Sequence, residues 1–314
     1  MYKIKQSPED FIVKEVTNIE IKEEGSYLYF QLKKKNYNTL TAIEHIANTL
    51  HLSLNRFGYA GNKDKNAITE QLVSVEDINK ENLEKLNLKD IEIKIIGYGE
   101  KYLSLGDLKG NEFIINVRNL SKDEINNFNQ KIKKKPILMP NLFGEQRFSK
   151  QNVDVGRALI KREFEKAADL LGLDIIDNDF IGAIRRVNKK ILRLYVHAYQ
   201  SFIFNETIKK YKDIKNNEKI PIIGFGTDLE NYNEKLREII EDILNKEKIN
   251  PRDFITVKMP ELSQEGSERD LYVEIENLEI LEKGKDTIRL KFFLQKGSYA
   301  TEAIDYLFRD SYLN

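Results

Sequence analysis

Short runs in which apolar and polar positions alternate occupy the first third of the chain, and this period of two predicts β-strands. Phe11–Val16 is the first run. In the second, Tyr27 to Leu32, the apolar residues Leu28, Phe30 and Leu32 alternate with Tyr27, Tyr29 and Gln31. Further strands are predicted at 72–75, 91–96 and 113–117.

Single helices are predicted between these strands. Thr41 and Glu44 have the spacing of a capping box, and apolar residues at helical spacing follow them. Ser121 and Glu124 mark a second helix start, and Pro136 ends that helix. Strands separated by single helices predict an α+β sheet that helices cover on one side.

From about Val153 the pattern changes to long helical stripes, at 158–171 and at 236–244. Between them, 194–205 is apolar almost all round, which predicts a buried helix; an aromatic platform for stacked bases is the alternative. Strand patterns return at 271–275 and 288–294. A helical block that interrupts a sheet protein indicates an inserted domain.

The composition allows two domains and shows no global charge. The chain has 314 residues, which exceeds the length at which one hydrophobic core stops growing, and 40% of them are hydrophobic. Its 51 basic and 51 acidic residues balance, so only a local basic surface could attract a polyanion. Basic clusters at 33–35, 131–135 and 185–190 are each more typical of a solvated face than of a binding site.

Cysteine is absent, which excludes disulfides and thiolate chemistry. The three histidines are His45, His51 and His197, and the first two are six residues apart on a predicted helix, so no metal site is predicted. No signal peptide and no apolar run of membrane-spanning length is present, so a soluble cytoplasmic protein is expected.

The candidate chemistry lies in the stretch 58–71, where Gly58 and Gly61 indicate a tight turn that presents Asp64 between Lys63 and Lys65. The glycine spacing fits neither a dinucleotide fingerprint nor a phosphate-binding loop. Taken alone, a stretch of this kind is more often an ordinary charged loop tip.

This stretch, from Gly58 to Gln71, resembles the signature of the TruD family of RNA pseudouridine synthases. Four further stretches resemble the same family in the same order, at 5–13, 105–113, 140–148 and 296–301. The chain departs from the family pattern at Ser149, where members usually have glycine, so the loop after Phe148 is expected to have a different shape.

The resemblance implies an α+β fold: a mixed or antiparallel pseudouridine synthase sheet flanked by helices, with an inserted, mainly helical α+β TRUD domain. The catalytic domain would be discontinuous, comprising 1–155 and 268–314, and the insertion would comprise 156–267 and form the other wall of an RNA cleft.

The resemblance also implies roles for single residues. Asp64 would be the catalytic carboxylate, and Lys5 the cation that keeps it ionised. Phe143 would stack on the target base, and Asn141 would support the site. Without the resemblance, Lys5 would be interpreted as a surface lysine, Phe143 as core and Asn141 as a structural cap.

Five further residues are candidates for RNA binding by the same resemblance: Lys63, Lys109, Asn111, Arg147 and Tyr299. A turn, a structural cap and core packing are the respective alternatives for the Lys109–Asn111 segment, Arg147 and Tyr299. No metal and no cofactor are expected, because isomerisation of uridine to pseudouridine needs a carboxylate, a surface for the detached base and base flipping.

The predicted function is therefore that of a tRNA pseudouridine synthase, an isomerase whose target, by resemblance, is most often uridine 13. The partner would be tRNA, no protein partner is implied, and a monomer is the default. A non-catalytic RNA-binding protein or tRNA chaperone is the alternative. A carboxylate-based glycoside or nucleoside hydrolase, pairing Asp64 with Glu9 or Asp10, ranks below both.

Overall fold

Strands from the first part of the chain and from near its end build one mixed sheet in the computed structural model, which describes residues 2–149, 151–211 and 218–310. The chain divides into two compact units. The first comprises the chain up to Leu138 together with 274–300 and 307–310, and the second comprises 139–273 with 301–306. The sequence-based domain boundaries at 155 and 268 differ from these packing units and stay a prediction.

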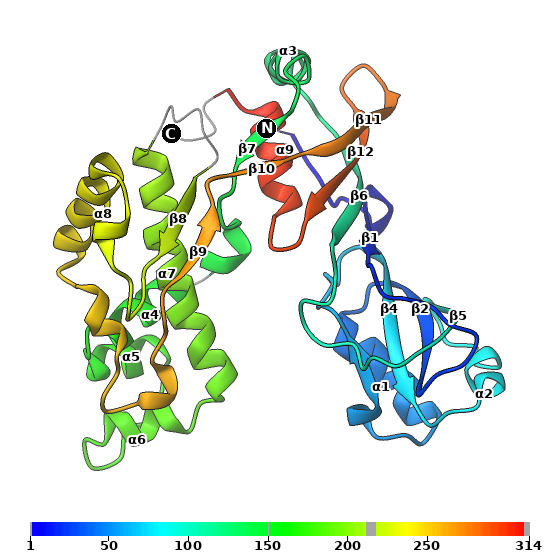
Figure 1. Ribbon diagram of the computed structural model, residues 1–314, viewed down its shortest axis with the longest axis horizontal. Helices are drawn as coiled ribbons and strands as arrows, with labels where there is room; N and C mark the ends of the chain where they lie inside the picture. Colours follow the sequence, from blue (N-terminus) through cyan, green and yellow to red (C-terminus); the bar gives the residue numbers. More distant parts are fainter. Residues whose placement is uncertain (1, 150, 212–217, 311–314) are drawn as a thin grey trace. The chain divides into compact units, whose positions relative to one another are not determined.

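The sheet of the first unit has eight strands in the described part of the chain, in the order β11-β12-β6-β1-β4-β2-β5, with β3 beside β4 (Figure 1). β1 and β4 run parallel, whereas the other paired strands of this sheet are antiparallel. The strands are β1 (Phe11–Val16), β2 (Tyr27–Lys35), β3 (Phe57–Tyr59), β4 (Ile68–Glu76), β5 (Ile91–Gly99), β6 (Gly110–Val117), β11 (Glu276–Lys283) and β12 (Ile288–Gln295). The predicted α+β fold with a mixed sheet flanked by helices is confirmed.

Helix α1 (Thr39–Thr49) covers part of one face of this sheet. Its Ile43 and Ile46 pack with Phe30 and Leu32 of β2 and Val73 of β4 in one buried cluster. Short α2 (Lys80–Glu84) adds Leu83 to the same core. This packing fixes the strands on both sides of the loop that carries the candidate carboxylate.

The start of α1 differs from the predicted capping box at Thr41. The N-cap is Asn38, whose side-chain oxygen accepts a hydrogen bond from the Thr41 amide at 2.8 Å. The prediction was wrong by one turn because Asn38 is the better N-cap and Thr39 is already helical. For α3 (Lys122–Lys131) the box predicted at Ser121 and Glu124 is confirmed.

In the second unit, α7 (Lys189–Lys210) contacts α4, α8 and β8 (Figure 1). The other elements of this unit are α4 (Asn152–Ile160), α5 (Phe164–Leu170), α6 (Phe180–Arg185), α8 (Glu234–Glu247), β8 (Lys219–Ile222) and β9 (Ser267–Asp270). β7 (Leu138–Pro140) pairs with β10 (Tyr272–Glu274), and α9 (Ala300–Phe308) follows β12. α7 confirms the buried helix predicted at 194–205.

The 3₁₀ turns are η1 (Pro8–Asp10), η2 (Leu54–Arg56), η3 (Glu145–Phe148), η4 (Leu229–Asn231), η5 (Pro251–Phe254) and η6 (Pro260–Leu262). Ser149, which ends η3, has φ −54°, a value open to any residue, so its side chain causes no backbone strain there. In the described ranges, no helix combines the length and apolar composition needed to cross a membrane.

Candidate active site

The loop between β3 and β4 presents Asp64, and its entry requires a glycine. A Cβ on Gly58 would lie 2.5 Å from the carbonyl oxygen of Leu103 and 2.6 Å from Oγ of Ser74, so only glycine lets these segments approach. The tight turn predicted at Gly58 and Gly61 is wrong, because Gly58 belongs to β3 and neither glycine has a positive φ; the loop that follows β3 nevertheless presents Asp64.

Buried polar side chains hold this loop against the sheet. The hydroxyl of Thr39 accepts the Lys63 amide at 2.8 Å and donates to Gln71 Oε1 at 2.7 Å. Gln71 in turn donates its Nε2 to the Gly61 carbonyl at 3.0 Å. Thr39 and Gln71 are almost fully buried, so each hydrogen bond replaces one that water would otherwise supply.

Lys63 also directs its side chain into the unit. Its Nζ lies 2.5 Å from Oε2 of Glu15 on β1, and the two side chains are 7% and 1% exposed. A pair this buried is costly to break because either partner would be left as an uncompensated charge. In this structure Lys63 therefore anchors the loop, and its predicted RNA contact stays a prediction.

Asp64 forms an ion pair with Lys5, as the family resemblance implied. Lys5 lies just before η1 with a left-handed backbone, φ 59°, and its Nζ is 4.2 Å from the Phe11 ring centroid. Burial alone would raise the pKa of Asp64, but the Lys5 ammonium and the amides of Asn66 and Lys65 together hold that pKa below its usual value. The carboxylate stays ionised although its side chain is only 36% exposed.

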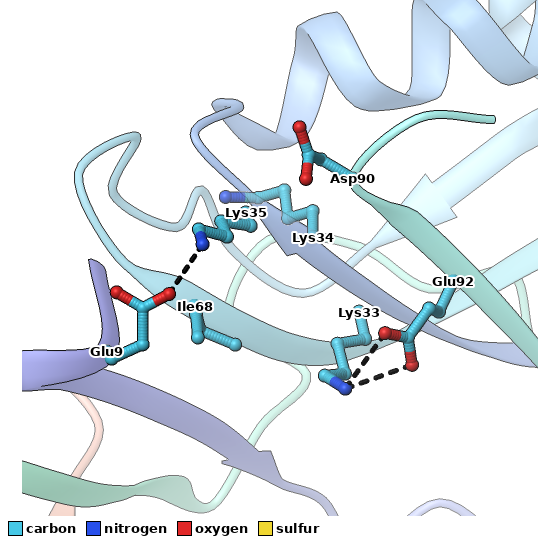
Figure 2. A pocket seen from close by; sticks show the side chains of 7 residues that line it. All are labelled: Glu9, Lys33, Lys34, Lys35, Ile68, Asp90 and Glu92. Atoms are coloured by element: carbon cyan, nitrogen blue, oxygen red, sulfur yellow. Dashed lines mark hydrogen bonds and ion pairs between the residues drawn. The ribbon is translucent and has the colours of Figure 1, made fainter. Parts of the chain in front are cut away.

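The basic run Lys33–Lys35 does not form a free cationic surface. Lys33 donates to Glu92 at 2.9 Å and Lys35 donates to Glu9 at 2.5 Å. Figure 2 shows both pairs as dashed lines. Both pairs neutralise the pocket at this edge of the sheet. Lys34 takes part in neither pair; it donates to backbone carbonyls of the Asp64 loop.

A second group of candidate residues lies in the second unit, around Phe143. Asn205 of α7 clamps the Phe143 backbone: its Oδ1 accepts the Phe143 amide, and its Nδ2 donates to the Phe143 carbonyl, both at 2.9 Å. The ring is 9% exposed, packs edge-on against Phe204 and lies 4.3 Å from the Arg269 guanidinium. It is thus a fixed aromatic surface that also belongs to the core.

The other two candidates of this unit surround that ring. Asn141 accepts hydrogen bonds from Arg269 at both its carbonyl and its Oδ1, and donates its Nδ2 to the Asp270 carbonyl. The Arg147 guanidinium lies 5.8 Å from the Phe143 ring centroid. Its Nε is buried and has no hydrogen-bond partner among residues 2–149, 151–211 and 218–310. Arg147 lines a pocket together with Phe143, His197 and Gln264, whereas Asn141 is not one of its lining residues.

The remaining candidates belong to the first unit. Lys109 is exposed, and its Nζ lies 5.5 Å from the Phe293 ring centroid. The predicted turn at Lys109–Asn111 is wrong, because Gly110 and Asn111 already belong to β6. Asn111 keeps its Oδ1 buried without a hydrogen-bond partner in the described part of the chain. Tyr299 is half-buried and directly precedes α9.

Sequence reasoning missed the residues that hold the loop, namely Glu15, Lys34, Thr39 and Gln71. For Lys34 a signal existed: it continues the alternation of Leu28, Phe30 and Leu32 on β2, so a lysine occupies a core-facing position. A charged residue in a buried register is a reason to look for its partner.

Among the residues described, no three His, Asp or Glu side chains are grouped so that they could hold a metal ion.

Comparison with known proteins gives one consistent result. The family model for "tRNA pseudouridine synthase D (TruD)" matches residues 2–177, 173–224 and 210–304. A probable tRNA pseudouridine synthase D of Methanosarcina acetivorans is 30% identical, with 96% of this chain and 91% of that protein covered. The corresponding protein of Nanoarchaeum equitans is 31% identical over 98% of both chains.

A crystal structure of the putative tRNA pseudouridine synthase D from Methanosarcina mazei superposes with a TM-score of 0.76 at 26% identity, covering 98% of this chain and 93% of that one. Fold and matches together define the class as pseudouridine synthases, which are isomerases. Within this class, the chain belongs to the TruD family.

Proposed function

We propose that Asp64 is the catalytic carboxylate with which this protein isomerises a uridine of tRNA to pseudouridine. The observation that carries the proposal is the ion pair with Lys5, which lowers the pKa of a partly buried carboxylate on a fixed loop. An ionised aspartate held in this way is ready to act as a nucleophile or to stabilise a cation at neutral pH.

The reaction breaks the bond between N1 of uracil and C1′ of ribose and forms a bond from C5 to C1′. The base is rotated in between, and a proton leaves C5 while N1 gains one, so the step is redox-neutral. Asp64 attacks either C1′ of the sugar or C6 of the base. Lys5 holds the carboxylate in its charged form and orients it.

The residues around Phe143 are proposed to bind the target nucleotide. An aromatic face that stacks on a base contributes roughly 1 to 3 kcal/mol, and the Asn205 clamp keeps Phe143 from reorienting. Asn141 supports this segment through Arg269, and Arg147 offers a donor for the nucleotide. Lys109, Asn111 and Tyr299 are proposed to contact RNA from the first unit.

By family membership we propose uridine 13 as the target, and a monomeric, cytoplasmic enzyme that needs no protein partner. The alternative, a non-catalytic tRNA-binding protein or chaperone, has no use for a carboxylate held by a lysine. A hydrolase that pairs Asp64 with Asp10 is disfavoured too, because Asp10 is 2% exposed and is bonded to Arg118.

The test is a pseudouridine map of unmodified tRNA transcripts after incubation with wild-type protein or with Asp64→Asn, with no metal or nucleotide added. We expect one new pseudouridine with the wild type and none with the variant, while tRNA affinity stays within severalfold. Modification by Asp64→Asn would remove Asp64 from the mechanism. Equal binding without modification by either protein, across a wider RNA panel, would favour the binding protein, and release of free uracil would indicate a hydrolase.

A further inference from the structure

Lys34 is a lysine in a core position, and its ammonium group reaches the loop that carries Asp64. The residue is 1% exposed and lies near the end of β2, opposite Thr69 of β4 and Ile91 of β5. Its three neighbours on the same face, Leu28, Phe30 and Leu32, are buried under α1. A lysine rather than an aliphatic residue here demands an explanation, since burial of a charge is costly.

The explanation lies in what its Nζ contacts. Nζ donates to the Asp64 carbonyl at 3.0 Å, to the Lys63 carbonyl at 3.5 Å and to the Tyr37 carbonyl. Ammonium has three donor protons and no acceptor, so three carbonyls match it fully. Two of these carbonyls belong to the loop itself, one of them to Asp64.

The contact pattern separates Lys34 from the other lysines nearby. Lys33 and Lys35 on the same strand are paired with Glu92 and Glu9, and Lys63 is paired with Glu15. In the described part of the chain, Lys34 has no carboxylate within ion-pair distance, so its ammonium group bonds to the loop carbonyls instead.

We infer that Lys34 is the positioning residue of the active site: through the carbonyls of Tyr37, Lys63 and Asp64 its ammonium group fixes the backbone from which the catalytic carboxylate projects. This inference rests on the proposed role of Asp64. Because a small misplacement of a reacting group costs rate and not folding, loss of Lys34 affects turnover more than substrate binding.

The same geometry makes the contacts of Lys34 with the three carbonyls sensitive to alkaline pH. Burial lowers the pKa of Lys34 to about 8; the charge of Asp64 opposes this shift and the charge of Lys63 adds to it. Besides these two, the charged groups around the pocket at Lys34 are Glu9 of η1, Asp90 before β5, Glu92 of β5, and Lys33 and Lys35 of β2. Deprotonation removes one donor proton and the positive charge, so turnover falls as pH rises through this pKa.

Stability changes in the opposite direction. The pKa of Lys34 in the folded protein lies below the ordinary 10.5. Between about pH 8 and pH 10.5, Lys34 is therefore protonated in the unfolded chain but not in the folded protein. Folding stability contributed by this group therefore increases over the range in which turnover falls. A lysine that served only to fill space in the core would not produce these opposite trends.

The experiment compares the wild type, Lys34→Met and Lys34→Arg, with Lys33→Met as matched control on the exposed side of the same strand. Single-turnover and steady-state pseudouridine formation on a tRNA transcript are followed across neutral and alkaline pH. We expect Lys34→Met to lose roughly 10- to 100-fold in kcat with KM within about twofold, and Lys33→Met to match the wild type. We expect the kcat of the wild type to fall above about pH 8. Lys34→Arg retains activity at that pH, because arginine stays charged.

Titration of Lys34 in the wild type, followed through its ¹³Cε signal, supplies a readout that does not depend on the variants folding. The stability of wild type relative to Lys34→Met, or the ¹³Cε titration of Lys34 in the wild type if the variant does not fold, is expected to report a pKa near 8. A wild-type kcat that stays flat while Lys34 titrates, or a folded Lys34→Met with kcat within twofold of the wild type, would overturn the inference. Asp64→Asn is assayed in parallel: turnover by that variant defeats the catalytic proposal, whereas its inactivity beside a fully active Lys34→Met defeats only the role of Lys34.

Discussion

At the residue scale, Lys5 makes the largest contribution that opposes burial and lowers the pKa of Asp64. Lys5→Met removes the ammonium and keeps a side chain of similar length. Burial, which raises the pKa of Asp64, then acts without its main opposing contribution, so the pKa rises and the acid limb of the kcat profile moves to higher pH. We expect at least a tenfold loss of kcat at mildly acidic pH, with partial recovery as pH increases.

Lys3→Met is the control for this variant, because Lys3 lies two positions away with an exposed side chain. It is expected to leave the acid limb where the wild type has it. An acid limb that Lys5→Met fails to move would remove the ion pair from the mechanism, even if kcat decreased.

Phe143 combines packing with its proposed stacking role, so the substitution must separate the two. Phe143→Leu keeps most of the apolar volume against Phe204 and removes the aromatic face. We expect a roughly tenfold loss of activity, from the stacking contribution of about 1 to 3 kcal/mol, and a stability loss of about 1 to 2 kcal/mol.

Phe204→Leu provides the comparison, since Phe204 is fully buried and contacts the edge of the same ring. It should cost similar stability, measured by urea unfolding, yet retain more of the activity at a temperature where both variants are folded. Equal activity losses in the two variants would assign Phe143 to the core alone.

Much of this site could be predicted from sequence because its chemistry-bearing residues stand in contiguous motifs. Asp64 and Lys5, 59 positions apart, were paired by resemblance and are in contact. Glu15, Thr39 and Gln71 could not be found in this way, since their role depends on which strands are neighbours. Lys34 needed both the strand register and the path of a loop about 30 positions away.

Between elements, the ion pair of Asp10 and Arg118 joins η1 to the end of β6. Asp10 is 2% exposed and accepts hydrogen bonds from Arg118, Asn116 and the Ser7 amide. Burial raises its pKa, but these donors outweigh burial and hold the pKa below the ordinary 3.8. We expect Asp10→Asn to lower the free energy of unfolding by about 1 to 3 kcal/mol at neutral pH.

The sign of the pH dependence follows from that depressed pKa. The stabilisation by Asp10 is fully present above the pKa of the unfolded chain and is lost as pH falls through the lower pKa of the folded protein. Denaturation curves of wild type and Asp10→Asn should therefore converge in acid. Glu9→Gln, which alters an exposed pair with Lys35, is expected to change stability much less than Asp10→Asn at any pH.

Elements with a clear period and a buried face were predictable, and those without were missed. β1 has the predicted bounds, Phe11–Val16. β11 is an edge strand with mostly exposed residues, so no alternation marks it. The stripe predicted at 158–171 is broken into α4 and α5 where Arg162 adopts a left-handed conformation, φ 60°, which no glycine or proline announces.

Over the whole molecule, the charges balance at 51 basic and 51 acidic residues, so tRNA affinity must depend on a few local cations. We expect the logarithm of the affinity to fall linearly with the logarithm of salt concentration. If Lys109 makes the phosphate contact proposed for it, Lys109→Gln should weaken binding and reduce the slope by about 1. Filter binding over a salt series measures both.

Lys33→Gln is the matched control, since Lys33 already has Glu92 as its partner. It is expected to leave the slope unchanged. A slope that responds to Lys33 and not to Lys109 would place the phosphate contact at β2 and not at the start of β6.

β6 pairs with β12, from Val117 opposite Ile288 to Gly110 opposite Gln295. This pairing therefore cannot form during synthesis until β12 has left the ribosome. The ribosome adds roughly 5 to 20 residues per second, so about 10 to 30 s pass between the emergence of the two strands. During this interval the cluster between Leu28 and Ile91 can already form, but one edge of β6 stays unpaired. A nascent chain stalled before Ile288 is therefore a substrate for chaperones or for aggregation, although it already contains Lys5 and Asp64.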